Sequence, residues 1–234
     1  MRLHRFITDC DLAQSLVTIT DAATLHQWQK VLRLKTGDRV ILCDGKSMEC
    51  EATIESLEAK HGRLTLENVH DVLTEPARHV TLYCSVLKRE NFEWVVQKCT
   101  ELGVKEIVPI IAERTVKTGL KMERLRVIAK EAAEQSGRGI IPEISEPMDF
   151  DVALKEAKKN ALNIFFHTAT EKNKAQGTMN TIGLWIGPEG GWSEKEVQLA
   201  QEHDFQMSSL GKLVLRAETA AVVACARQFL EHID

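Results

Sequence analysis

The chain has 234 residues and a formal net charge of −4. This length allows one large domain, or a small domain beside a larger one, with a sizeable buried core. The charge excludes a uniformly basic protein, so any surface for nucleic acid has to be local. No apolar run approaches the roughly 18 residues of a membrane span, and no signal-peptide core follows Met1, so we expect a soluble, cytoplasmic protein.

The cysteines and histidines predict neither disulfides nor a metal site. The cysteines form no CxxC pair, and most lie in apolar runs where a reduced thiol packs as a small hydrophobic group. The eight histidines are scattered and form no HExxH motif. We therefore expect six reduced cysteines, mostly in the core: Cys10, Cys43, Cys50, Cys84, Cys99 and Cys225.

Residues 1–72 are rich in strand patterns. Apolar runs at residues 39–43 and 48–57 flank an Asp-Gly turn, which supplies the positive φ values of a tight hairpin. A third strand is expected at 63–69, and residues 22–32 have helical character. About four strands in so short a span predict a small β-barrel.

Residues 73–77 form the expected linker, because Pro76 stops the preceding strand and the pattern then changes. From residue 78 to 234, strand and helix patterns alternate, which predicts an α/β domain with a mostly parallel sheet and helices on both faces. The expected strands are 79–86, 105–112, 163–167, 181–186 and 212–215, and the expected helices are 91–102, 121–136, 218–230 and one that begins at 194.

Ligands in open α/β sheets bind beyond the carboxyl ends of the strands, so the loop after Ile186 is of interest. Residues 187–193 read GPEGGWS, and Ser193 with Glu196 forms the capping box of a following helix. Three glycines leave backbone that can lie flat against a ligand. The alternative is a plain tight turn. The loop matches neither a P-loop nor a dinucleotide fingerprint, and the chain has no GxSxG elbow.

A second loop precedes the last expected helix. The expected strand at 212–215 delivers Arg216 and Glu218 to the sheet edge that carries Glu189, which concentrates charge where a reacting group could lie. The alternative is a helix-entry pair in which the helix dipole favours Glu218. The residues alone do not separate the two interpretations.

The segment 113–138 carries seven basic and four acidic side chains. By itself this pattern is more typical of a solvated helix face, in which acids and bases pair at helical spacing, than of a nucleic-acid surface.

Several motifs resemble those of the RsmE family, within the SPOUT superfamily of knotted methyltransferases. Residues 186–191 (IGPEGG) and 210–220 (LGKLVLRAETA) are similar to its signature pair. Further matches in the family's order lie at residues 4–6 (HRF), 31–33 (VLR), 97–104 (QKCTELGV) and 131–138 (EAAEQSGR). One departure is Trp192, where the family has phenylalanine, which should alter packing and not chemistry.

The resemblance implies a C-terminal SPOUT trefoil-knot domain at 78–234 and an N-terminal PUA-like RNA-binding barrel at 1–72. It implies an S-adenosylmethionine-dependent homodimer that methylates N3 of a uridine in small-subunit (16S) ribosomal RNA, either as free RNA or in the assembled 30S subunit. Alternatives are a non-catalytic RNA-binding or ribosome-assembly factor, and a SPOUT enzyme that acts on a ribose hydroxyl or on transfer RNA.

The resemblance also implies site residues. We expect Arg216 to stabilise negative charge on the uracil carbonyls, and Glu189 or Glu218 to take the N3 proton, unless these acids only fix Arg216. No metal is expected. Cofactor contacts are implied at Ile186, Gly187, Pro188, Glu189, Gly190, Leu210, Gly211, Val214, Leu215, Thr219 and Ala220. RNA contacts are implied at Arg5, Arg33, Arg114, Lys117, Lys121, Arg124 and Arg138.

Overall fold

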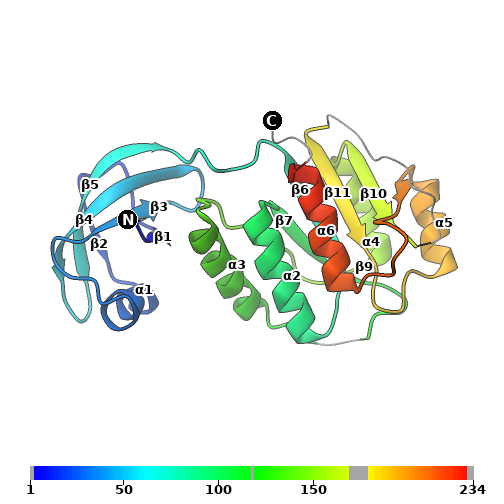
Figure 1. Ribbon diagram of the computed structural model, residues 1–234, viewed down its shortest axis with the longest axis horizontal. Coiled ribbons are helices and arrows are strands. Elements are labelled where there is room, and N and C mark those ends of the chain that lie inside the picture. The colour runs from blue at the N-terminus through cyan, green and yellow to red at the C-terminus, as the bar shows by residue number, and fades with distance from the viewer. Residues whose placement is uncertain (1–2, 117–118, 169–178, 231–234) are drawn as a thin grey trace. The chain divides into compact units, whose positions relative to one another are not determined.

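The computed structural model describes residues 3–116, 119–168 and 179–230 (Figure 1). The chain divides into two compact units. Unit 1 consists of Met1–Glu75 and Ala133–Ile141, and unit 2 of Pro76–Ala132 and Pro142–Asp234. The region of the expected linker, around Pro76, contains no helix or strand. The segment Ala133–Ile141 joins unit 1 although it lies far along the chain, which the sequence pattern does not indicate.

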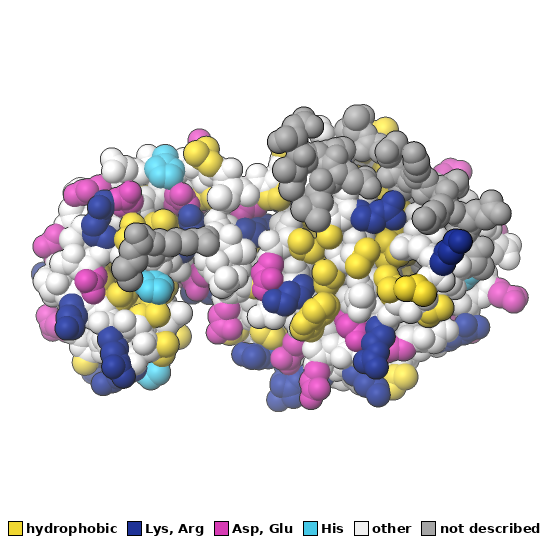
Figure 2. All heavy atoms as spheres, in the orientation of Figure 1, with side chains coloured by type: hydrophobic (Ala, Val, Ile, Leu, Met, Phe, Trp, Pro, Cys, Tyr) yellow, Lys and Arg dark blue, Asp and Glu magenta, His cyan; other side chains and the backbone are white. Residues whose placement is uncertain are grey.

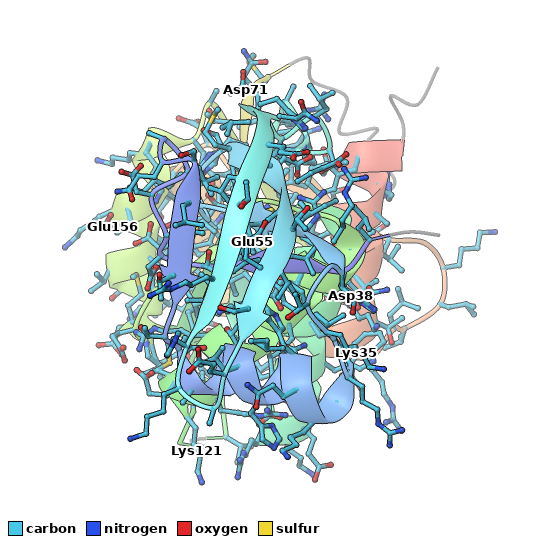
Figure 3. The ribbon with its side chains drawn as sticks, turned by 90° about the vertical axis from the view of Figure 1, so that its left-hand side faces the viewer. Lys35, Asp38, Glu55, Asp71, Lys121 and Glu156 are labelled. Carbon is cyan, nitrogen blue, oxygen red and sulfur yellow. The ribbon has the colours of Figure 1, made fainter. Side chains whose placement is uncertain are left out.

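Unit 1 contains a five-stranded sheet of order β1-β3-β4-β5-β2. Figure 3 looks onto this sheet, where Glu55 lies on the solvent side and accepts a hydrogen bond from the Thr65 hydroxyl at 2.9 Å. The expected hairpin is confirmed at its predicted residues. The short edge strands β1 and β2 were not expected. The elements are β1 (Arg5–Ile7), β2 (Leu16–Ile19), α1 (Ala22–His26), the π-helix η1 (Gln27–Val31), β3 (Arg39–Cys43), β4 (Met48–Leu57) and β5 (Gly62–Asp71).

The hairpin turn of unit 1 is fixed by one side chain. Oδ1 of Asp44 accepts hydrogen bonds from the backbone N–H groups of Lys46, Ser47 and Met48 at 2.8, 3.0 and 3.0 Å. Gly45 has φ +75°, which a residue with a Cβ rarely adopts. The inward residues of β3 and β4 then pack around the fully buried Trp28. The Asp-Gly signal therefore sets the register of the strand pair on which this core forms.

Unit 2 is an α/β structure. Its sheet has the order β12-β10-β11-β6-β7-β8, with β9 also beside β7, and every strand pair is parallel. The elements are β6 (His79–Ser85), α2 (Arg89–Leu102), β7 (Glu106–Ile111), α3 (Met122–Ser136), β8 (Glu143–Ile144), β9 (Met148–Asp149), α4 (Phe150–Glu156), the 3-10 helix η2 (Ala157–Lys159), β10 (Leu162–Phe166), β11 (Thr181–Ile186), α5 (Glu194–Glu202), β12 (Gln206–Ser208) and α6 (Ala217–Leu230). The last residues of α3 belong to unit 1.

Helices cover both faces of this sheet. On one face the rings of Tyr83 and Trp185 stack at 4.3 Å between centroids, and the apolar residues of α4 and α5 complete the cluster. On the other face α6 packs on β6 and β11, and α2 packs against α6 (Figure 1). The predicted mostly parallel sheet with helices on both faces is confirmed. It leaves the carboxyl ends of its strands as the edge where loops can form a site.

The prediction of a strand at residues 212–215 is wrong. These residues form no strand, and Leu213 and Val214 are 81% and 83% exposed. The edge position beside β10 is taken by β12 (Gln206–Ser208), which the pattern analysis missed. The apolar run predicts burial, but β12 already occupies the position beside β10. The segment instead leads directly into α6, which begins at Ala217.

Candidate functional site

A cleft of about 440 Å³ lies at the carboxyl edge of the sheet in unit 2. Four segments form it: the chain after β7, the end of β10, the loop after β11 and the entry to α6. This is where α/β sheets bind ligands, and the volume suits a small organic molecule. Of the predicted site residues, the cleft is lined by Ile186, Gly187, Pro188, Glu189, Gly190, Val214, Leu215, Arg216 and Ala220.

A smaller hollow of about 80 Å³ adjoins the cleft and shares Leu215 and Ala220 with it. The predicted residues Leu210 and Gly211 line this hollow. Thr219 lines neither space. The cleft is also lined by Arg114, which was expected to contact RNA, and by Gly191 and Trp192 of the glycine-rich loop. No local pattern marks the other lining residues, which are Phe166, His167, Thr168 and Ala217.

The loop after β11 is folded tightly upon itself. The Gly191 N–H donates to the Pro188 carbonyl at 2.8 Å, and Gly191 has φ +69°. A Cβ on Gly187 would lie 3.0 Å from the indole of Trp192. Both glycines are therefore required by the loop's own shape, as the interpretation as a tight turn predicts, and the loop also lines the cleft.

Trp192 does more than fill space. Its indole N–H donates to the Phe166 carbonyl at 3.1 Å, and its ring stacks on Phe165 at 4.6 Å between centroids. The loop after β11 is thus tied to the end of β10. A phenylalanine at this position would keep the stacking and lose the hydrogen bond. Trp192 therefore makes a polar contact in addition to the expected change in packing.

The predicted capping box is present at the start of α5. The Ser193 hydroxyl accepts from the Glu196 N–H at 3.3 Å, and the Glu196 carboxylate accepts from the Ser193 N–H at 2.8 Å. The second oxygen of Glu196 accepts from the N–H of Glu113, after β7, also at 2.8 Å. The carboxylate of Glu196 is buried, and each of its oxygens accepts a hydrogen bond from a backbone N–H group.

Arg114 crosses from the chain after β7 to the same loop. Its Nη1 donates to the carbonyl oxygens of Gly190 at 3.0 Å and Trp192 at 3.2 Å. A Cβ on Gly190 would lie 3.4 Å from the Cβ of Arg114, so the arginine stem runs over the glycine. Arg114 is therefore part of the cleft wall.

The charged residues at the entry to α6 differ in exposure. The side chain of Arg216 is 85% exposed, whereas that of Glu218 is 13% exposed, and their nearest nitrogen and oxygen atoms are 4.0 Å apart. Oε2 of Glu218 is buried without a hydrogen-bond partner among the described residues. Glu189 is exposed and lines the cleft together with Arg216, but Glu218 does not line it.

Cys84 lies at the end of β6, near these acids. Burial raises the pKa of its thiol well above the ordinary value, and nearby Cys99, Glu189 and Glu218 raise it further. The thiol therefore stays protonated near neutral pH and is a poor nucleophile. All six cysteines are free, and all except the half-buried Cys10 are buried.

The predicted RNA-contacting residues have different surroundings. Arg138 is 3% exposed and forms an ion pair with Glu75 at 3.0 Å inside unit 1, so the expectation of a phosphate contact there is corrected. Arg5 is mostly buried and bonded to Glu49. The Arg124 guanidinium lies 3.7 Å from Glu93. The exposed residues are Arg33, Arg114, Lys121 and Arg124, whereas Lys117 lies outside the described residues.

Neither a metal-binding cluster nor a membrane-spanning helix occurs among the described residues. Among residues 3–116, 119–168 and 179–230, no group of three or more His, Cys, Asp and Glu side chains is placed to hold a metal ion. In the same ranges, none of the helices combines the length and the apolar character needed to cross a bilayer.

Comparison with known families assigns both parts of the chain. Residues 74–228 match the RNA methyltransferase domain family, and residues 29–67 match the RNA methyltransferase PUA domain family. The chain is 36% identical over 225 residues to ribosomal RNA small subunit methyltransferase E of Synechocystis sp., covering 92% of this chain and 73% of the relative. It is 32% identical to the Bacillus subtilis protein of the same name, covering 86% and 84%.

The chain belongs to the RsmE family of RNA methyltransferases. Solved structures agree in fold. A Legionella pneumophila protein, solved with the cofactor SAM, superposes with a TM-score of 0.88 at 32% identity, covering 97% of each chain. A Neisseria gonorrhoeae ribosomal RNA small subunit methyltransferase E, bound to S-adenosyl methionine, gives 0.88 at 29% identity with the same coverage. The expected fold class, a SPOUT domain with a PUA-like N-terminal domain, is confirmed.

Replacing Trp192 with phenylalanine removes the donor for the Phe166 carbonyl and leaves that acceptor buried. We expect the Trp192→Phe variant to lose about 1–2 kcal/mol of unfolding free energy. Urea denaturation followed by circular dichroism measures it. Trp94→Phe on the exposed side of α2 is the matched control and should change stability by less than about 0.5 kcal/mol. Equal stabilities of the two variants would contradict the assigned hydrogen bond.

Proposed function

We propose that this protein is an S-adenosylmethionine-dependent methyltransferase that modifies N3 of a uridine in small-subunit (16S) ribosomal RNA. The observation that supports this most strongly is the cleft at the sheet edge. It brings together the glycine-rich loop after β11, the entry to α6 and two charged side chains, Arg216 and Glu189. Relatives named for this activity on ribosomal RNA support the substrate class.

The residues present fit the cofactor. A cleft of about 440 Å³, joined to a hollow of about 80 Å³, matches the size of a nucleoside carrying an amino-acid arm. Apolar side chains such as Ile186 and Leu215 can pack against an adenine, and Gly187 and Gly190 line the same cleft. We assign Ile186–Gly190, Leu210, Gly211, Val214, Leu215 and Ala220 to this ligand, and Thr219 to packing behind it.

When bound, S-adenosylmethionine supplies a methyl group on a sulfonium centre that is already activated for transfer. The protein must therefore hold uridine N3 in line with that methyl group and remove the N3 proton. N3 is hidden by base pairing in a duplex, so the target base has to be unpaired or flipped out.

The charged residues divide these tasks. Arg216 is exposed on the cleft wall and stabilises negative charge on the uracil carbonyls as the proton leaves. Glu189 lines the cleft and is the better placed of the two acids to accept the proton. Glu218 is buried beside Arg216, 4.0 Å from its guanidinium, and attracts it toward the cleft wall.

RNA binding is assigned to exposed basic residues and to the N-terminal domain. We place a PUA-like barrel at 1–72, a linker at 73–77 and the catalytic domain at 78–234. The family match at residues 29–67 supports the first of these. Arg33, Lys121 and Arg124 remain the proposed phosphate contacts, because Arg5 and Arg138 are held by acids within unit 1. The substrate is ribosomal RNA, free or in the 30S subunit, which places the enzyme in the cytoplasm.

We also propose that the protein is a homodimer. Leu213 and Val214 are adjacent and more than four-fifths exposed beside the cleft, and contiguous exposed apolar surface is typical of an interaction site. Multi-angle light scattering of the purified chain should give twice the mass of the sequence. A monomeric mass at micromolar concentration would overturn the proposal.

Two measurements test the function itself. Calorimetry with S-adenosylmethionine should give a single binding event, which separates an enzyme from a factor that only binds RNA. Purified small subunits from a strain lacking this protein should then accept a methyl group, and nuclease digestion with mass spectrometry should find it on uridine N3. Methylation of a ribose hydroxyl, or of transfer RNA instead, would replace this proposal with a different substrate.

The Arg216→Ala variant should bind S-adenosylmethionine as the wild type does and lose methyl transfer by roughly a hundredfold or more. The reason is that Arg216 stabilises charge that develops only during the reaction. Single-turnover methylation at saturating cofactor measures the loss, and calorimetry checks cofactor binding. Unchanged turnover would remove Arg216 from the mechanism.

A further inference from the structure

Two chain segments that are far apart in sequence, residues 113–114 and 190–196, meet at the cleft and are joined by the side chains of two residues. Glu196, in the first turn of α5, accepts the N–H groups of Ser193 and Glu113 with its two carboxylate oxygens, each at 2.8 Å. Arg114, the next residue after Glu113, donates back to the carbonyls of Gly190 and Trp192. The chain after β7 and the loop after β11 are thus bound to each other in both directions.

These bonds, with one inside the loop, occupy five of the loop's backbone groups. Between Pro188 and Ser193, the carbonyls of Pro188, Gly190 and Trp192 and the N–H groups of Gly191 and Ser193 all have partners within the protein. A glycine-rich loop without such partners would sample many backbone states, and a ligand would have to order it on binding. Here the ordering is done by side chains that approach from outside the loop.

We propose that Arg114 and Glu196 are positioning residues for the cofactor: together they hold the loop after β11 in its binding shape before S-adenosylmethionine arrives. This inference rests on the proposed function. It assigns Arg114 to the cofactor side of the reaction and no longer to RNA. Glu196 acts through Glu113, because fixing that N–H places the neighbouring Arg114 over Gly190.

The effect should appear in cofactor binding and not in the chemical step. In the Arg114→Ala variant the loop keeps its sequence but loses two hydrogen bonds, so the ligand has to order it. We expect the Kd and the KM for S-adenosylmethionine to rise about tenfold. The turnover number at saturating cofactor and the KM for RNA should stay within about twofold of wild type.

Conservative variants sharpen the test. Arg114→Lys keeps a multiple donor on a long stem and should return the cofactor Kd to within about threefold of wild type. Glu196→Gln keeps one acceptor oxygen and loses the other, so it should weaken cofactor binding in the same direction. Because the two residues act on one loop, the double variant should be weakened by less than the product of the single effects.

Lys159 provides a matched control. It is also a partly exposed cation with two hydrogen bonds, to Oε1 and Oε2 of Glu106 at 2.8 and 2.7 Å. Glu106 begins β7, so this pair lies at the amino edge of the sheet, away from the cleft. The Lys159→Ala variant should leave the cofactor Kd unchanged, and thermal melting shows whether either variant loses the fold.

Three results would overturn the inference. They are an unchanged cofactor Kd in Arg114→Ala, a raised KM for RNA with normal cofactor binding, and a fall in turnover alone. The second would return Arg114 to the RNA surface. A wild-type protein that does not bind S-adenosylmethionine would refute the proposed function itself, whereas wild-type binding that Arg114→Ala matches would refute only the positioning role.

Discussion

The cleft depends on how backbone groups find hydrogen-bond partners where the parallel sheet ends. Beyond the last residue of each strand the ladder stops, and buried N–H and C=O groups need other partners. In this protein side chains supply them: Glu196 for two N–H groups, Arg114 for two carbonyls and Trp192 for one. Each of these contacts joins different parts of the chain or caps a helix, so the sheet edge becomes one connected surface.

This constraint explains why glycines and large side chains occur together at the site. Gly187 is needed because the Trp192 indole lies 3.0 Å from where its Cβ would be, and the Arg114 stem packs over Gly190. The space that the glycines leave is filled by Trp192 and Arg114. Both side chains line the cleft together with the glycines. The loop is therefore thin and well supported, a combination that favours close approach of a ligand to backbone without a large ordering cost.

The sequence predicts those features that are encoded locally. The hairpin follows from its Asp-Gly turn, the start of α5 from the Ser193 and Glu196 capping box, and most of the parallel strands from runs of buried residues. The glycines of the loop after Ile186 and its place after a strand predict that it lies at the site. The strand prediction for residues 212–215 fails because an apolar run does not reveal whether a sheet edge is available, and that edge is occupied by β12.

Long-range pairing is what the sequence could not show. Arg138 pairs with Glu75, 63 positions away, and Arg114 reaches carbonyls 76 and 78 positions away. In the sequence both arginines belong to the basic segment 113–138, because the local sequence does not show which residue a charged side chain pairs with. The same limit applies to Phe166 and Thr168, which belong to the cleft only because β10 lies beside β11.

The pair at the entry to α6 differs from the hydrogen-bonded cleft walls. A separation of 4.0 Å between Arg216 and Glu218 is too long for a hydrogen bond, and the exposed Arg216 side chain gains little from the ion pair. Glu218 meanwhile keeps one buried oxygen without a partner among the described residues, which costs free energy. Arg216 is thus attracted toward the wall but not fixed to it, so its charge stays available to a carbonyl that becomes negative in the cleft.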